Sequence, residues 1–336
     1  MPMLVPRYYR SFPSETVCSL MCFAAFAVAI AVSSGAPDAL AQSAPPPASQ
    51  TSQPVPAWQT AAGGKMEFEV ASIHPAAPGA STRQNFDMSI EDMTIPPGGR
   101  ISATGALGMF IQFAYKLSVF QDKAAFDHLP KWATTEYFDI EAKAPTTNVT
   151  KDQMRLMMQS LLADRFKLAV HFETPDGPAM ALVLVNPGKL GPRLRPHSEG
   201  PACDAKIPPI DRSSPKIPDV WIPVCGTTQM VDWRDKTVIL GSRNTTLDIF
   251  SDWIPLIETL DRPVVNRTGL TERFDIELNF TPPWIKDKEQ SADAPLDLTG
   301  PTFLEALKDQ LGLKLVSTRA PVRTLVIDNV EQPSTN

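Results

Sequence analysis

The residues best suited to take part in a reaction are four acids in two copies of one tetrapeptide. Phe-Asp-Ile-Glu occurs at positions 138–141 and again at 274–277. Two carboxylates that flank a substrate are the catalytic pair of most glycoside hydrolases. Residues two apart on a strand share a face, however, and Asp139 and Glu141 alternate with the core residue types Phe138 and Ile140. We therefore expect the acids to face solvent, and the pattern favours a structural strand over a hydrolase site.

Other catalytic signatures are absent from the sequence. It contains no HExxH, GxSxG, P-loop or GxGxxG motif, so no cofactor and no metal site are predicted. The four histidines are scattered along the chain and are interpreted as surface or turn residues: His74, His128, His171 and His197.

The tryptophans fall into two groups. Trp132 and Trp253 lie within helical patterns and are predicted to be core residues. Trp221, Trp233 and Trp284 lie in or beside expected loops, where exposed indole rings can line a sugar or peptide groove. These three are candidate ligand-facing residues.

The N-terminal segment has the pattern of an export signal. Arg7 and Arg10 precede an apolar run from 17 to 32, and Ala39 and Ala41 supply small residues at a cleavage site. We predict a signal peptide over residues 1–41, which gives a periplasmic or secreted product. A retained membrane anchor is the alternative, although the run is shorter than the roughly 20 residues that a spanning helix prefers. After cleavage no membrane span is expected.

Two cysteines, Cys203 and Cys225, lie beyond the predicted signal. In an oxidising compartment they are predicted to form a disulfide, which would close a loop of about 20 residues and contribute on the order of 3 kcal/mol. A zinc site is disfavoured because the pair lacks CxxC spacing and neighbouring histidines.

Proline accounts for 34 of the 336 residues and marks two irregular stretches. Residues 42–64 are a Pro, Ser and Ala-rich tract and are predicted to be a linker. Residues 191–235 hold a second Pro-rich tract, predicted to be a long loop that the disulfide fastens. The linker precedes a segment with regular patterning, 65–190, and the loop separates it from a second one, 236–333.

The two regular segments resemble each other. Before each Phe-Asp-Ile-Glu copy, apolar residues repeat at helical spacing, starting at Leu107 and at Leu247. After each copy, a capping box opens a second helix, Thr150 with Gln153 and Thr302 with Glu305. An alternating strand and a return strand follow each second helix, and each such pair is predicted to form a hairpin.

These patterns predict an α+β fold. It would consist of two similar strand-helix-strand-helix-hairpin units, with mainly antiparallel sheets and helices on one face. We interpret the similarity of the two units as an internal duplication.

The sequence resembles the soil-associated family of exported bacterial proteins of unknown function. The resemblance rests on Lys131-Trp132 ahead of the first duplicated motif, on MRLMMQSLLADRFKL from Met154, on RPVVNRTGLT from Arg262, and on Gly312-Leu313-Lys314-Leu315. It implies export, and for some members fusion of the same domain to membrane metallopeptidases similar to β-lactam sensor-transducers. It implies no catalytic residues.

Composition narrows the function classes further. The formal net charge is −6, which argues against non-specific nucleic-acid binding. Enzymatic activity is left open but is not favoured. The favoured hypothesis is a non-catalytic binding or sensing module for a small-molecule, glycan or protein ligand. The alternative is an exported hydrolase acting on a cell-wall or plant-derived polymer.

Overall fold

The computed structural model describes residues 55–91, 97–127, 129–198, 225–226, 228–232, 237–282 and 300–333. The predicted signal peptide and most of the predicted loop 191–235 lie outside them. Within the predicted linker, Ala57–Ala61 form a short helix, α1, and Gln59 in it is buried. Regular structure thus begins inside the tract that the composition assigns to the linker. None of the helices in the described residues is long and apolar enough to cross a membrane.

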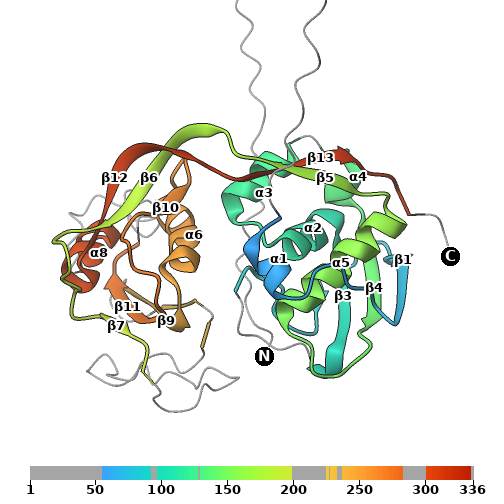
Figure 1. Cartoon of the computed structure of the whole chain (residues 1–336), viewed down its shortest axis with the longest axis horizontal. Coiled ribbons are helices and arrows are strands. Elements are labelled where there is room, and N and C mark those ends of the chain that lie inside the picture. Colours follow the sequence, from blue (N-terminus) through green and yellow to red (C-terminus); the bar gives the residue numbers. More distant parts are fainter. Residues whose placement is uncertain are drawn as a thin grey trace, which may run out of the picture. The chain divides into compact units, whose positions relative to one another are not determined.

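The first half of the chain contains a four-stranded antiparallel sheet in the order β1-β4-β3-β2 (Figure 1). Its strands are β1 (Val70–Pro75), β2 (Arg83–Gln84), β3 (Arg100–Ala106) and β4 (Tyr137–Lys143). A 3-10 turn, η1 (Pro97–Gly99), leads into β3. The first Phe-Asp-Ile-Glu copy thus lies in β4, between β1 and β3.

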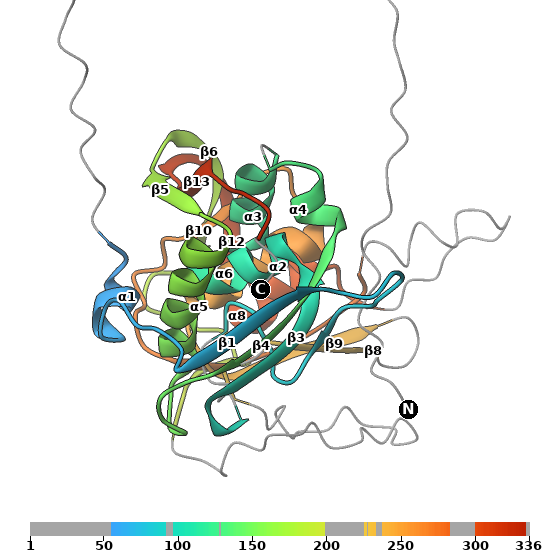
Figure 2. The ribbon, with the colours of Figure 1, turned by 90° about the vertical axis from the view of Figure 1, so that its right-hand side faces the viewer.

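Helices cover one face of this first sheet (Figure 2). They are α2 (Leu107–Tyr115), α3 (Val119–Phe126), α4 (Trp132–Thr135) and α5 (Lys151–Arg165). Ile101, Phe138 and Ile140 of the sheet share one buried cluster with the apolar stripes of α2 and α5. The predicted capping box of Thr150 and Gln153 opens α5.

The second half repeats this plan. Its antiparallel sheet has the order β7-β11-β9-β8, with strands β7 (Leu194–Pro196), β8 (Gln229–Asp232), β9 (Val238–Thr245) and β11 (Phe274–Phe280). Helices α6 (Leu247–Glu258) and α8 (Phe303–Leu311) contribute to its core. The predicted box of Thr302 and Glu305 opens α8, and Gly312, with φ of 71°, ends it.

The two sheets have the same strand order when β1, β2, β3 and β4 are matched to β7, β8, β9 and β11. In both, the strand with the duplicated motif lies in the interior of the sheet, and its neighbour in the sheet, β3 or β9, leads into a helix. The α+β class is therefore observed. Descent of the two halves from one duplicated unit stays a prediction.

The predicted hairpins do not form. The strands concerned are β5 (Ala169–Glu173) and β6 (Asp176–Leu184) in the first half, and β12 (Leu313–Pro321) and β13 (Thr324–Asn329) in the second. β5 pairs with β13, and β6 pairs with β12, so each strand takes its antiparallel partner from the other half (Figure 1). A short strand, β10 (Val264–Asn266), runs parallel to β6 on its other side.

The connections explain this exchange. A two-residue hairpin needs positive φ angles, which Gly, Asn or Asp supply. Thr174-Pro175 and Val322-Arg323 offer none of these residue types, and none of the four has a positive φ. The two connections instead lie side by side: the Val322 amide donates a hydrogen bond to the Pro175 carbonyl at 3.0 Å. Leu325 consequently lies in the core of the first half, and Leu182 in that of the second.

Candidate functional site

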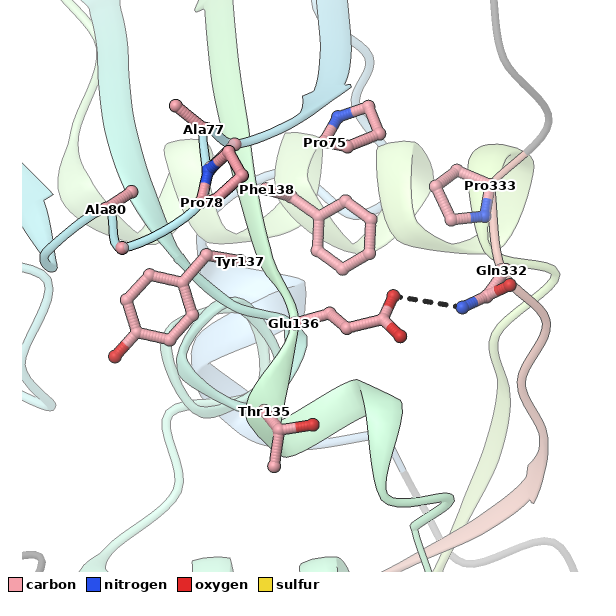
Figure 3. Close-up of a pocket in the computed structure, with 12 residues that line it drawn as sticks. Pro75, Ala77, Pro78, Ala80, Thr135, Glu136, Tyr137, Phe138, Gln332 and Pro333 are labelled. Atoms are coloured by element: carbon pink, nitrogen blue, oxygen red, sulfur yellow. Dashed lines mark hydrogen bonds between the residues drawn. The ribbon is translucent and has the colours of Figure 1, made fainter.

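The described residues form an open pocket at one end of the first sheet, which we call the end pocket (Figure 3). Its volume is about 550 Å³. Three segments line it: the end of β1 with the loop that follows it (75–80), the entry to β4 (135–138), and the C-terminal residues Gln332 and Pro333. Residues far apart in the chain thus meet where β1 ends and β4 begins.

Hydrogen bonds hold these three segments together. The Ala76 amide donates to the Tyr137 carbonyl at 2.8 Å, which fastens the loop to β4. The Gln332 side-chain amide donates to the Glu136 carboxylate at 3.0 Å, and the Glu331 amide donates to the Phe166 carbonyl at 2.7 Å. The C-terminal segment is therefore fixed at the pocket by both side-chain and backbone contacts.

The side chains divide the end pocket into two sides. Glu136 and Phe138 point toward Gln332 and Pro333, whereas Tyr137 points the opposite way, beside Pro78 and Ala80 (Figure 3). Phe138 is anchored in the core, where its ring packs edge-on against Phe166. The Tyr137 hydroxyl accepts a hydrogen bond from Thr82 at 3.4 Å.

The lining is mainly apolar and carries one charge. Of the described residues that line the end pocket, Glu136 is the only charged one, and none of them is Lys or Arg. A carboxylate offers about four acceptor positions, of which Gln332 occupies one. The pocket can therefore accept a ligand that combines an apolar surface with a cationic or hydrogen-bond-donating group.

The duplicated acids have different surroundings in the two halves. Asp139 and Glu141 lie on the face of the first sheet away from the core and accept hydrogen bonds from Thr104 and Ser102. The prediction that all four acids face solvent is wrong for the second copy. Glu277 is buried and paired with Arg193.

Asp275 is also largely covered. His197 lies 2.7 Å from its carboxylate, and the Asn244 amide donates to the same oxygen at 3.0 Å. Strand β7, which is preceded by Arg193 and followed by His197, packs beside β11 and shields these acids. The sequence did not reveal this because β7 lies at the edge of the Pro-rich loop.

A second His-Asp pair is exposed. His171 Nδ1 lies 2.9 Å from Asp328, and Nε2 lies 3.4 Å from Glu173. The hydrogen bond with Asp328 raises the pKa of His171, with a smaller contribution from Glu173. Both imidazoles of these pairs hydrogen-bond to carboxylates, and the described part of the chain holds no group of three His, Cys, Asp or Glu side chains that could bind a metal ion.

Buried charges elsewhere are explained by structure. Lys151 and Arg155 of α5 are buried beneath residues 87–91. Arg155 donates to the carbonyls of Ser89 and Glu91 at 2.8 and 2.9 Å, and the Lys151 ammonium lies 3.5 Å from Asp87. Desolvation lowers the pKa of Lys151 to about 8 although Asp87 opposes it. These groups fasten a loop to a helix and do not line the end pocket.

The residues singled out from the sequence contribute little to this site. Trp221, Trp233, Trp284 and Cys203 lie outside the described residues, as does His128. Cys225 is buried beside β9, where its backbone forms an isolated parallel β-bridge with that of Arg243. The disulfide with Cys203 stays a prediction.

Glu136, Tyr137 and Gln332 were not predicted as site residues. One signal was available for the first two: Thr-Glu-Tyr directly precedes the duplicated motif, where the second copy has Thr-Glu-Arg. The aromatic residue at this position distinguishes the first half. No local pattern indicated Gln332, because its role depends on the path of the C-terminal segment.

Comparison with known proteins places the chain in a family. Residues 108–330 match the family described as "Protein of unknown function (DUF3738)". The match covers more than half of the chain, so the protein belongs to this family. It includes the entry to β4 but neither the loop 75–80 nor Gln332 and Pro333. No curated protein and no solved structure matches the chain.

Proposed function

We propose that the protein is a non-catalytic binding or sensing module and that the end pocket is its ligand site. One observation carries this proposal: an open pocket of about 550 Å³ joins apolar walls to a single carboxylate. This volume is typical of ligand pockets, which combine apolar lining with a few polar groups that set orientation. Hydrogen bonds already hold the lining segments in place, which also favours binding, because a ligand pays less conformational entropy to order them.

The hydrolase alternative requires two facing acids or a serine within reach of a histidine. The described residues offer no observation in its favour. Asp139 and Glu141 each accept a hydrogen bond from a neighbouring hydroxyl, and Asp275 and Glu277 are occupied by His197 and Arg193. We therefore propose binding alone.

A thermal-shift screen of the mature protein tests the ligand site. The panel contains peptidoglycan fragments, plant glycans, antibiotics and short peptides, since a ligand that binds only the folded state raises the melting temperature. We expect at least one class to raise it in the wild type and to lose the effect in Glu136→Gln and Tyr137→Ala. Glu67→Gln, an exposed glutamate outside the end pocket, is the matched control. Equal shifts in all variants would place the ligand elsewhere, and a flat response across the panel would count against the proposal.

Export is a second part of the proposal. It is supported by Arg7 and Arg10, the apolar run that follows, and the small residues at Ala39 and Ala41. The resemblance to the soil-associated family adds the expectation that the product works outside the cytoplasm, and its fusions to sensor-like peptidases motivate the sensing role. Mass spectrometry of the mature N-terminus should find Gln42 as the first residue. A chain that starts at Met1 or Pro2 would contradict cleavage.

A further inference from the structure

Strand β1 presents an open edge next to the end pocket. In the described part of the chain it pairs with β4 on one side only, from Val70 opposite Lys143 to Pro75 opposite Phe138. The Ala76 amide donates a hydrogen bond to the carbonyl of Tyr137, which lies directly opposite it. Because antiparallel strands alternate, Ser72 and His74 direct their backbone groups to β4 as well. Ala71 and Ile73 direct theirs to the open edge.

The protection of this edge is limited to Pro75, the last residue of β1, which lacks a backbone N–H. Edge strands are normally blunted by lysine, by proline within the strand, by bulges or by inward-pointing charges. The residues from Val70 to His74 include no lysine, no proline and no acid, and Val70 is 64% exposed. At the opposite edge of the same sheet, β2 is only two residues long. The sheet therefore has one edge suited to accepting a further strand.

The open edge and the end pocket meet at one residue. Pro75 is the last residue of β1 and also lines the pocket. A strand added along β1 therefore has one of its ends at the pocket. Backbone hydrogen bonds would supply affinity along the edge, and the pocket would select the terminal residue.

Charge decides the direction of the added strand. β1 runs toward the pocket, so an antiparallel partner has its amino-terminal end there and a parallel partner has its carboxyl-terminal end there. Among the described residues that line the pocket, Glu136 alone is charged; it attracts an ammonium or guanidinium group and repels a carboxylate. We propose that the ligand of the module is an extended peptide segment that adds antiparallel to β1 with a cationic amino-terminal end against Glu136.

This inference rests on the proposed binding function and narrows its ligand class. It requires an extended segment of about six residues, the length that β1 offers. Side chains on one face of the added strand would lie beside Val70, Ser72 and His74, which are polar or exposed. Specificity along the strand is therefore broad, and the terminal cation is the main selective feature.

The first test uses the peptide Lys-Val-Thr-Ile-Thr-Val-Ser-Gly with a free amino terminus, titrated into the mature full-length protein by isothermal calorimetry. A matched peptide has an acetylated terminus and Gln in place of Lys. We expect the neutral peptide to bind about fivefold more weakly, the scale of one exposed ion pair. In Glu136→Gln the two peptides should bind equally. If the cationic and the neutral peptide bind the wild type equally, the proposed contact between the cationic amino-terminal end and Glu136 is wrong.

The second test separates strand addition from simple pocket binding. Two further peptides each carry N-methyl groups on two alternate backbone amides. In the first peptide these amides are on one edge of the extended strand, and in the second they are on the other edge. Strand addition predicts that one set weakens binding about tenfold, because the hydrogen bonds to β1 are lost, while the other set is tolerated. Equal effects of both sets would contradict addition to β1. These probes leave the protein unchanged, so misfolding of a variant cannot confuse the result.

The outcome also distinguishes this inference from the proposed function. If a glycan or an antibiotic raises the melting temperature through Glu136 and Tyr137 while none of the peptides binds, the module binds at the end pocket but the peptide inference is wrong. If nothing binds at the end pocket, both are wrong.

Discussion

Leu325, in the last strand of the chain, lies opposite Phe172 of β5 and is buried in the core of the first half. The reverse exchange places β6 of the first half against β12 over nine residue pairs, from Leu184 opposite Leu313 to Asp176 opposite Pro321. Each half therefore completes its core with a strand that belongs to the other. The two halves are expected to fold as one interdependent unit.

Cutting the chain between the halves tests this interdependence. A protease site inserted after Gly200 leaves β5, β6 and β7 on the first fragment, and it lies before Cys203, so the predicted disulfide does not join the fragments across the cut. The two fragments should elute together in size-exclusion chromatography under native conditions and separately in urea. Separate elution in native buffer would show that the halves are independent domains.

Leu325→Ala should destabilise the protein by about 2–4 kcal/mol, because it removes a fully buried leucine side chain and leaves a cavity. Urea unfolding monitored by circular dichroism measures the change. Val316→Ala in β12 is the control, since that side chain is 43% exposed and should lose less than about 1 kcal/mol. A loss at Leu325 no larger than that at Val316 would place the last strand outside the first core.

Asp252 of α6 makes stability depend on pH. Burial raises the pKa of its carboxyl to about 7 from 3.8, and Asp248 adds to the shift, while the hydrogen bond with Ser118 and the charge of Lys116 oppose it. An acid whose pKa is raised in the folded state lowers the free energy of unfolding when it ionises. This loss of stability is absent below pH 4, grows as the pH rises to 7 and is constant above.

Asp252→Asn should therefore stabilise the protein by on the order of 2 kcal/mol at pH 8 and have little effect at pH 4. Urea unfolding at the two pH values measures this difference. Asp309→Asn, at an exposed position on α8, is the control. A stabilisation that does not change between pH 4 and pH 8 would contradict titration of Asp252.

The predicted disulfide can be tested chemically. Peptide mapping of non-reduced material from the periplasm or the medium should yield one fragment that joins Cys203 to Cys225. Replacing both cysteines by serine should lower the stability by about 3 kcal/mol. Two thiols that react with an alkylating reagent in the folded protein would refute the bond.

The sequence predicted local structure well where side chains act on their own element. The capping boxes at Thr150 and Thr302 were both confirmed. The alternating strand predicted after the first capped helix was confirmed too, because Leu168 is buried whereas Lys167 and His171 are exposed. Each of these signals depends on residues within one turn or one strand.

Features that depend on the partner of a strand were missed. The hairpins failed because adjacency in sequence was taken as adjacency in space, although Thr174-Pro175 and Val322-Arg323 lack the residue types of tight turns. The end pocket was missed for a related reason. Its wall at Gln332 is brought to Glu136 only because β13 crosses to the first half.

Binding at the end pocket is tested most directly by nuclear magnetic resonance of the ¹⁵N-labelled mature protein. The probe is the panel compound that raises the melting temperature most. The backbone amide signals of residues 76–77, 79–80 and 135–137 should shift with a single binding curve, and for a peptide those of Ala71 and Ile73 should shift with them. Shifts confined to the second half, or none at saturating probe, would contradict a ligand site at this end of the first sheet.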